Sequence, residues 1–211
     1  LLLTDGYLQK RGLVGYASRD QILMNIFIDL VRANSKKPPN LLQRSDGRLE
    51  AYVFDPKLVE KLLSLSPSYK KSPENLSKEE YLRGPQPTVD FLLAQDAKTR
   101  ICCIRLAMSA DGCIITYRLK NEQLRPRLML CCANPSLVEG WRKIFLSLGI
   151  QAGVKFGRKW SGVEGIMVWK KEMVEVFRKL GGFVDGVKIS RKSPNFAGVE
   201  KNTLLNWSLE S

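Results

Sequence analysis

The sequence predicts an α+β fold built from a duplicated unit of the order αββαββα, and three observations lead to this. An Asp-Gly step occurs twice, at Asp5-Gly6 and Asp111-Gly112, each time after an apolar stretch. The segments after each step repeat the same order of helical and strand-like patterns. Basic residues alternate with apolar residues along the strand-like segments. A lone Asp-Gly is a common turn, but two matched copies indicate internal symmetry.

The two halves also match beyond the Asp-Gly steps. We align 26–30 with 144–148, because both segments have apolar residues at helical spacing. We align 51–54, together with the helical pattern after it, with 166–169. The differences in spacing are assigned to loops, where duplicated domains usually gain and lose residues.

A segment rich in Pro, Ser and Lys separates the halves and is predicted to be a linker. One short helix is expected inside it, starting near Ser77, because Ser77 and Glu80 have the spacing of a capping box. The predicted parts are a first repeat with a truncated motif (1–66), the linker (67–99), a second repeat (100–191) and a C-terminal segment (192–211). The last of these is expected to hold a helix from about Phe196 to Leu209.

The composition favours a globular protein with an anionic partner. The 211 residues include 34 Lys and Arg against 21 Asp and Glu, a net charge of +13. Nucleic acid is the commonest partner for such a basic domain. The sequence contains no run of 18 apolar residues, so no membrane span is predicted. With no signal peptide in view, we expect a cytoplasmic (prokaryotic) or organellar protein that is not secreted.

The absence of His narrows the possible chemistry. Ser-His and Cys-His nucleophiles and Cys-His zinc sites are excluded. The five cysteines lie in apolar stretches without zinc spacing and are expected to be reduced core residues. Carboxylates, lysines and a recruited metal remain for catalysis.

The two Asp residues, Asp5 and Asp111, are the candidate metal ligands. A helix C-terminus carries partial negative charge, so two carboxylates at paired helix ends repel each other and favour a divalent cation between them. Mg²⁺ prefers a few carboxylates together with water and phosphate oxygens, which suits a site facing a nucleic-acid backbone. Other divalent cations would fit the same ligands.

Polar and basic side chains on the strand-like segments are the candidate DNA contacts. Alternation places one set on a helix-covered face and the other on an open face, from which Arg, Lys and Gln can reach base edges in the major groove. Tyr7, Gln9 and Arg11 are expected to share the open face in the first half, and Thr116, Arg118 and Lys120 in the second. The candidates are Gln9, Arg11, Gln43, Arg44, Arg48, Arg118, Lys120, Gln123, Arg125, Arg127, Lys155 and Arg158.

These features resemble the LAGLIDADG homing endonucleases in their two-repeat, single-chain form. Asp5 and Asp111 match the acidic position of the nine-residue motif. The second copy departs from it, with Arg105 and Leu106 where the family prefers small residues and Ser109 at an often acidic place. The first copy begins within the motif, as in a fragment or a processed product.

The resemblance implies a fold and an activity. The fold would be a pseudo-two-fold saddle of antiparallel sheets with the motif helices between them. The activity would be Mg²⁺-dependent, site-specific cleavage of a long double-stranded DNA target by a monomer encoded in an intron or intein, with Asp5 and Asp111 as ligands. Lys159 is the candidate catalytic-site lysine.

Two alternatives remain open. One is an inactive descendant that binds nucleic acid, intron RNA included, as a splicing maturase or regulator. The other is an unrelated basic α+β binding module, which requires the duplication to be accidental. Similarity of the two halves in three dimensions separates this last alternative from the others.

Overall fold

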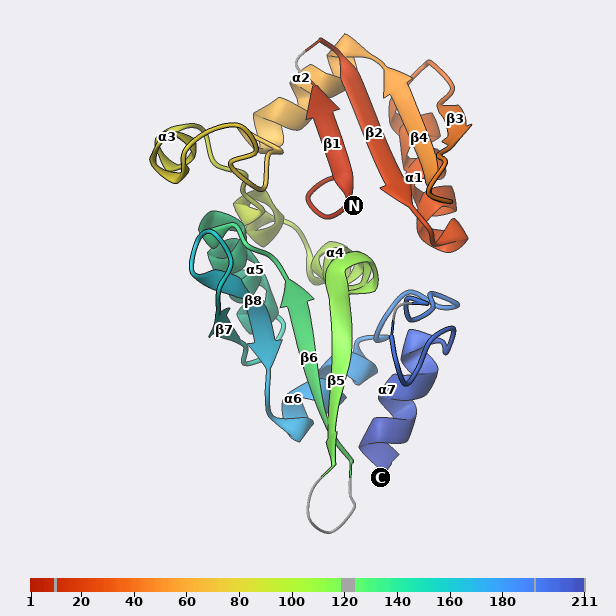
Figure 1. The fold of residues 1–211 in the computed structure, drawn as a ribbon, viewed down its shortest axis with the longest axis vertical. Helices are drawn as coiled ribbons and strands as arrows, with labels where there is room; N and C mark the ends of the chain where they lie inside the picture. The colour runs from red at the N-terminus through yellow and green to blue at the C-terminus, as the bar shows by residue number, and fades with distance from the viewer. Residues whose placement is uncertain (10, 119–123, 192, 211) are drawn as a thin grey trace. The chain divides into compact units, whose positions relative to one another are not determined.

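The computed structural model describes residues 1–9, 11–118, 124–191 and 193–210 (Figure 1). The chain divides into two compact units, Leu1–Phe91 and Leu92–Ser211. In the described ranges, no helix is both long and apolar enough to cross a membrane.

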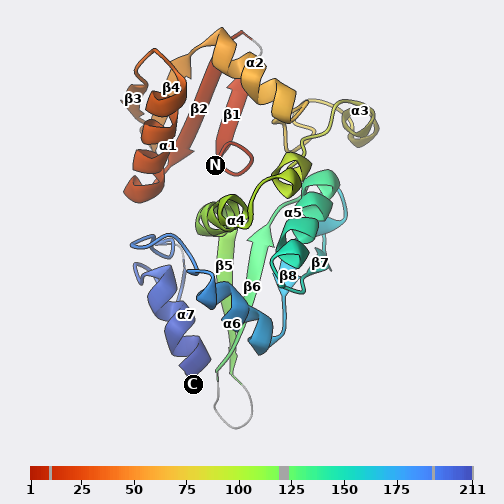
Figure 2. The same cartoon turned by 180° about the vertical axis from the view of Figure 1, so that it is seen from behind.

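The first unit is one antiparallel sheet with helices on one face. Its elements are β1 (Gly6–Gln9), β2 (Leu13–Ser18), α1 (Gln21–Asn34), β3 (Asn40–Gln43), β4 (Leu49–Phe54) and α2 (Pro56–Leu65). The strand order is β1-β2-β4-β3. Both α1 and α2 lie behind the sheet in Figure 1 and in front of it in Figure 2.

The second unit repeats this plan with its motif helix complete. Its elements are α4 (Ala97–Asp111), β5 (Gly112–Arg118), β6 (Leu124–Cys131), α5 (Pro135–Ser147), β7 (Gly153–Phe156), β8 (Val163–Val168), α6 (Lys171–Lys179) and α7 (Lys201–Glu210). The strand order is β5-β6-β8-β7, the same as in the first unit. The duplication predicted from the sequence is therefore confirmed, and an accidental repeat is excluded.

The helix caps give the alignment of the two halves. Asp20 caps α1 and Asn134 caps α5, each accepting a hydrogen bond from the backbone N–H three residues later. Phe27 of α1 then corresponds to Trp141 of α5, and both are buried. The sequence alignment of 26–30 with 144–148 was wrong by one helical turn, since a helical apolar pattern repeats after such a shift. The alignment of 51–54 with 166–169 agrees with the positions of β4 and β8.

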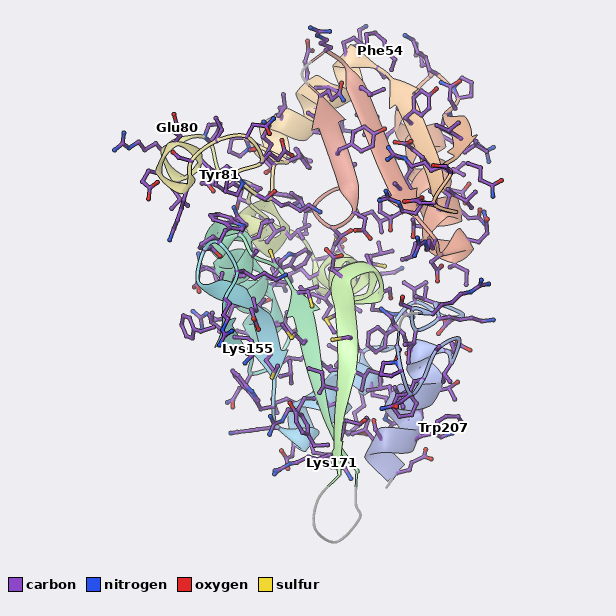
Figure 3. The ribbon with its side chains drawn as sticks, in the orientation of Figure 1. Phe54, Glu80, Tyr81, Lys155, Lys171 and Trp207 are labelled. Atoms are coloured by element: carbon purple, nitrogen blue, oxygen red, sulfur yellow. The ribbon has the colours of Figure 1, made fainter. Side chains whose placement is uncertain are left out.

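The linker has the predicted short helix, α3 (Lys78–Arg83). Ser77 Oγ accepts from the backbone N–H of Glu80, and the Glu80 carboxylate accepts from the N–H of Ser77, which confirms the capping box. Tyr81, marked beside Glu80 in Figure 3, is buried and donates its hydroxyl to Lys70 O. A 3₁₀ helix, Asp90–Ala94, follows.

The C-terminal helix starts later than predicted, at Lys201 rather than near Phe196. The chain before it pairs with itself, because Ile189 N–H donates to Val199 O and Lys201 N–H donates to Val187 O. Gly198 has a φ of 80°, which a continuing helix does not allow. These backbone bonds replace the first turn expected from the apolar pattern.

Each unit has its core between the sheet and its helices. In the first unit, Tyr16 of β2 packs against Phe27 of α1 with ring centroids 5.3 Å apart. In the second, Leu128 and Leu130 of β6 are almost fully buried. The opposite face of each sheet is open, and the strand register places Gln9, Arg125, Arg127 and Lys155 of the candidate DNA contacts on it.

Candidate functional site

Asp111 is the last residue of the motif helix α4, and the strand β5 starts immediately after it. Gly112 N–H donates to Met108 O and closes the last turn. A Cβ at Gly112 would lie 2.4 Å from Met108 O and 2.7 Å from Met108 Cα, closer than real Cβ contacts. The glycine is therefore needed because the strand leaves the helix against its own last turn.

The first motif has the same local geometry. Asp5 directly precedes β1, and Thr4 N–H donates to Leu1 O across a turn. A Cβ at Gly6 would lie 2.5 Å from Leu2 Cα. In both copies the glycine after the Asp thus approaches the residue four positions before it. The two Asp-Gly steps are structurally equivalent, although only part of the first motif precedes Asp5.

The two carboxylates differ in exposure within their own units. Asp5 is exposed, whereas Asp111 is half-buried. Among the described residues, no group of three or more Cys, Asp or Glu side chains could hold a metal.

Lys159 lies in the turn between β7 and β8 and is exposed. The pKa of the Cys131 thiol shows which charges surround it. That pKa is raised, first because Cys131 donates a hydrogen bond to Cys113; the negative charge of Asp111 adds to the rise and Lys159 opposes it. Asp111 and Lys159 are thus both within electrostatic reach of Cys131.

The open face of the second sheet is set by the pairing of β5 with β6. Ile115 pairs with Arg127 and Tyr117 with Arg125. The guanidinium of Arg127 lies 4.3 Å from the centre of the Tyr117 ring. Its Nε is buried without a hydrogen-bond partner in the described part of the chain. Arg125 and Arg127 therefore lie on the open face, as predicted.

The prediction for the other residues of β5 was wrong at Thr116. Thr116 pairs with Pro126 and shares the helix-covered face with the buried Leu128. Arg118 ends β5 opposite Leu124. Lys120 and Gln123 lie outside the described residues. The hairpin carries its described basic side chains on β6 rather than β5.

On the outer strand, Lys155 of β7, labelled in Figure 3, is the basic candidate. It pairs with Gly165 of β8. The register of β8 with β6 places Lys155 on the same open face as Arg127. Arg158 is exposed in the turn after β7. Basic side chains therefore follow the open face from β6 to β7 and its turn.

The open face of the first sheet has an acidic centre that the sequence did not reveal. Glu50 of β4 is 5% exposed and accepts a hydrogen bond of 2.7 Å from the Tyr7 hydroxyl. Arg44 donates from Nε and one terminal nitrogen to the same carboxylate, at 2.8 and 2.7 Å. The Arg44 hydrogen bonds are the main reason that the pKa of Glu50 is lowered. The charge of Arg44 is thus already compensated inside the protein.

The other candidates of the first unit are more accessible. Gln9, on the same face as Tyr7, is exposed, and so are Arg11 in the β1–β2 turn and Gln43 at the end of β3. Arg48 forms a 2.7 Å ion pair with Asp46 in the β3–β4 turn. Of the basic candidates here, Arg44 and Arg48 serve the hairpin itself.

Three solved structures have a similar fold. The homing endonuclease I-WcaI bound to its DNA recognition sequence superposes with a TM-score of 0.55 at 14% identity, covering 88% of this chain and 80% of that one. I-DmoI in complex with DNA and Mn gives 0.51 at 16% identity, covering 85% and 92%. The N-terminal LAGLIDADG domain of DUF199/WhiA gives 0.50 at 11% identity, covering 90% and 79%.

Sequence comparison adds no relative, since no family model and no curated protein matches the chain. The strand orders, the two motif ends and these superpositions agree with one another. The chain has the LAGLIDADG homing endonuclease fold, with a ββαββα unit followed by a complete αββαββα unit in one polypeptide.

Proposed function

We propose that this protein is a DNA endonuclease that hydrolyses phosphodiester bonds of a long double-stranded target with the help of a divalent cation. The observation that carries the proposal is the equivalence of the two motif ends, each with an Asp before a glycine that no other residue could replace without displacement. A chain that only needed the fold could end these helices with other polar residues.

The donors fit a hard cation. One carboxylate from each of Asp5 and Asp111, completed by phosphate oxygens and water, is the kind of ligand set that Mg²⁺ prefers. Bound there, the cation would activate a water and stabilise the charge that develops on the phosphate. Structures of the similar I-DmoI contain DNA with Mn or with Ca, which supports divalent-cation chemistry for this fold.

The protein's own residues supply the remaining functions. Lys159, exposed in the turn after β7, would place a positive charge beside the scissile phosphate and favour the developing negative charge. Arg125, Arg127 and Lys155 would contact DNA from the open face of the second sheet. Gln9 and Arg11 would do so from the first sheet, where they are accessible.

The single-chain duplication supports a monomer, because both halves of a pseudo-symmetric DNA site can be covered without a partner subunit. We further propose that the protein is encoded in an intron or intein and acts inside the cell or organelle on DNA. Sequencing the genomic flanks of this reading frame tests the origin, since an interrupted host gene is expected.

The activity can be tested on a target that the protein itself selects. Selection of bound duplexes from a randomised library, followed by cloning into a supercoiled plasmid, provides a substrate. With Mg²⁺, we expect wild type to nick or linearise this plasmid. Asp5→Asn and Asp111→Asn should each lose most of the cleavage but keep DNA binding, because the strands are unchanged and repulsion between carboxylate and phosphate is reduced.

The results separate cleavage from binding. Full cleavage by Asp111→Asn would refute the proposed metal site. A wild-type protein that binds the selected duplex tightly but does not cut it with Mg²⁺ or Mn²⁺ would instead identify a binding protein that has lost catalysis.

A further inference from the structure

Lys201, the first residue of α7, has its ammonium group inside the second unit. The residue is 8% exposed and lies in the same stripe as the buried Leu204, Leu205 and Ser208. The Nζ donates to three backbone carbonyls: Gly112 O at 2.7 Å, Ser109 O at 2.8 Å and Met108 O at 3.3 Å. All three acceptors belong to the end of the motif helix α4 or to the glycine that follows it.

The arrangement has a clear electrostatic reason. The last carbonyls of a helix have no partner within it and carry partial negative charge. A buried ammonium is costly to desolvate, and here three charge-assisted hydrogen bonds and the helix end offset that cost. The Phe183 ring, 5.3 Å from Nζ, adds a cation–π contact. A neutral donor could satisfy one or two carbonyls, but only a cation also compensates the negative helix end.

The acceptors enclose Asp111 along the chain. Ser109 lies two residues before Asp111 and Gly112 directly after it, so Lys201 holds the backbone on both sides of the carboxylate. A further hydrogen bond holds the same turn, in which Val184 N–H donates to Ser109 Oγ at 2.7 Å. Ser109, which stands where the motif often has an acidic residue, therefore has a structural role.

We infer that Lys201 is a positioning residue for Asp111. It fixes the backbone that carries the carboxylate and provides a positive charge against the negative end of α4, so that Asp111 stays placed for a cation and phosphate. This role rests on the endonuclease function proposed above. The start of α7, after the αββαββα unit, thereby becomes part of the proposed half-site.

Lys201→Met tests the inference, because it keeps most of the side-chain volume and removes the charge and the donors. We expect the single-turnover cleavage rate to fall by about 100-fold, the effect of a displacement near 1 Å at a reacting group. The Mg²⁺ concentration at half-maximal rate should rise, while DNA affinity without metal stays unchanged. Lys201→Gln, which keeps amide donors without the charge, should show the same direction and serves if the Met variant does not fold.

Asn202→Ala is the matched control. Asn202 bonds to the N–H and carbonyl of Phe183 and to Asp185, so its loss loosens the same segment and leaves the ammonium in place. We expect a lower melting temperature with a near-normal cleavage rate and Mg²⁺ dependence. Equal loss of cleavage in Asn202→Ala and Lys201→Met would show a merely structural role and overturn the inference, as would wild-type cleavage by folded Lys201→Met.

Hydrogen exchange separates this inference from the proposed activity. The Gly112 amide, which closes the last turn of α4, should exchange faster in the Lys201 variants than in wild type or Asn202→Ala. Unchanged protection overturns the positioning role whatever the enzyme does. If the Lys201 variants exchange faster but the wild type cuts no DNA, the contact between Lys201 and the end of α4 is supported. Only the proposed endonuclease function is then refuted.

Discussion

Replacing Gly112 by Ala tests the link between the motif geometry and cleavage. The new Cβ would lie 2.4 Å from Met108 O and 2.7 Å from Met108 Cα, where ordinary contact begins at 3.4 Å. Both are backbone atoms of the last turn of α4 and cannot rotate away. The φ of Gly112 is −92°, so an Ala suffers no backbone strain and the clash alone acts. The helix end or the strand start must therefore move by roughly 1 Å.

Two effects follow from this displacement. Overpacking of this size costs about 1–3 kcal/mol of unfolding free energy, which lowers the melting temperature by several degrees. Because Asp111 directly precedes the clash, its carboxylate moves with the backbone. A shift of about 1 Å at a catalytic group reduces the rate by about 100-fold, more than the loss of stability accounts for.

Gly84→Ala is the control, because Gly84 also follows a helix. Its φ is −78° and the nearest atom to its Cβ would be Tyr81 O at 3.4 Å, so the substitution should be tolerated. Thermal unfolding and single-turnover cleavage of both variants are the measurements. If Gly112→Ala is as stable and as active as Gly84→Ala, then the motif does not require the glycine, and the proposed link between motif geometry and cleavage is refuted.

Three further substitutions test other parts of the site. Gly6→Ala, in the first motif, should reduce DNA cleavage as Gly112→Ala does in the second motif. Normal DNA cleavage by Gly6→Ala would argue against equivalent motif ends. Arg127→Ala should weaken duplex binding by about 1–3 kcal/mol in a gel-shift or anisotropy titration, and Arg44→Ala should weaken it less because Glu50 already neutralises that charge; the reverse order would contradict the site. The pKa of Glu50 is lowered, chiefly by its hydrogen bonds with Arg44. The ionised carboxylate therefore stabilises the fold at pH values above the unfolded pKa of about 4.3. This stabilisation is lost as the pH falls through the lowered pKa of the folded state. Thermal unfolding should thus find Glu50→Gln less stable than wild type at neutral pH, with the gap closing below about pH 4, and a gap that persists in acid would refute the assignment.

The topology could be predicted from the sequence because its signals are local and occur twice. Apolar periodicity gives helix or strand, and the repeated order makes each half a check on the other. The alignment within α1 and α5 needed another signal. An apolar helical pattern shifted by one turn matches nearly as well, whereas the caps Asp20 and Asn134 match in one register only.

The face of β5 could not be predicted from β5 alone. Ile114 and Ile115 are adjacent, so each alternating set contains apolar residues. The pairing with β6 decides between them, because Ile114 lies opposite the buried Leu128 and Ile115 opposite Arg127. Register is a property of two strands, and only the partner strand has a clear alternation.

Lys201 was missed for a different reason, although the sequence holds a signal. It falls at helical spacing with Leu204, Leu205 and Ser208, in a stripe that otherwise faces the core. A lysine in such a stripe either extends to solvent or has buried acceptors. The choice depends on the end of α4, which is 89 residues away along the chain at the bond to Gly112.

The distribution of charge predicts which half would dominate the DNA affinity proposed above. The second unit has 20 Lys and Arg against 10 Asp and Glu, whereas the first has 14 against 11. Moreover, Arg44 and Arg48 of the first sheet are paired with carboxylates, while Arg127 of the second stacks on Tyr117 and pairs with no carboxylate in the described part of the chain. Since phosphate contacts dominate affinity and its salt dependence, the second unit is expected to anchor the duplex. The first unit, with Gln9 exposed on its open face, would be better suited to hydrogen-bonding base edges than to attracting the backbone. Under the proposed function, the second unit would therefore supply most of the attraction to DNA, whereas each unit would supply one carboxylate.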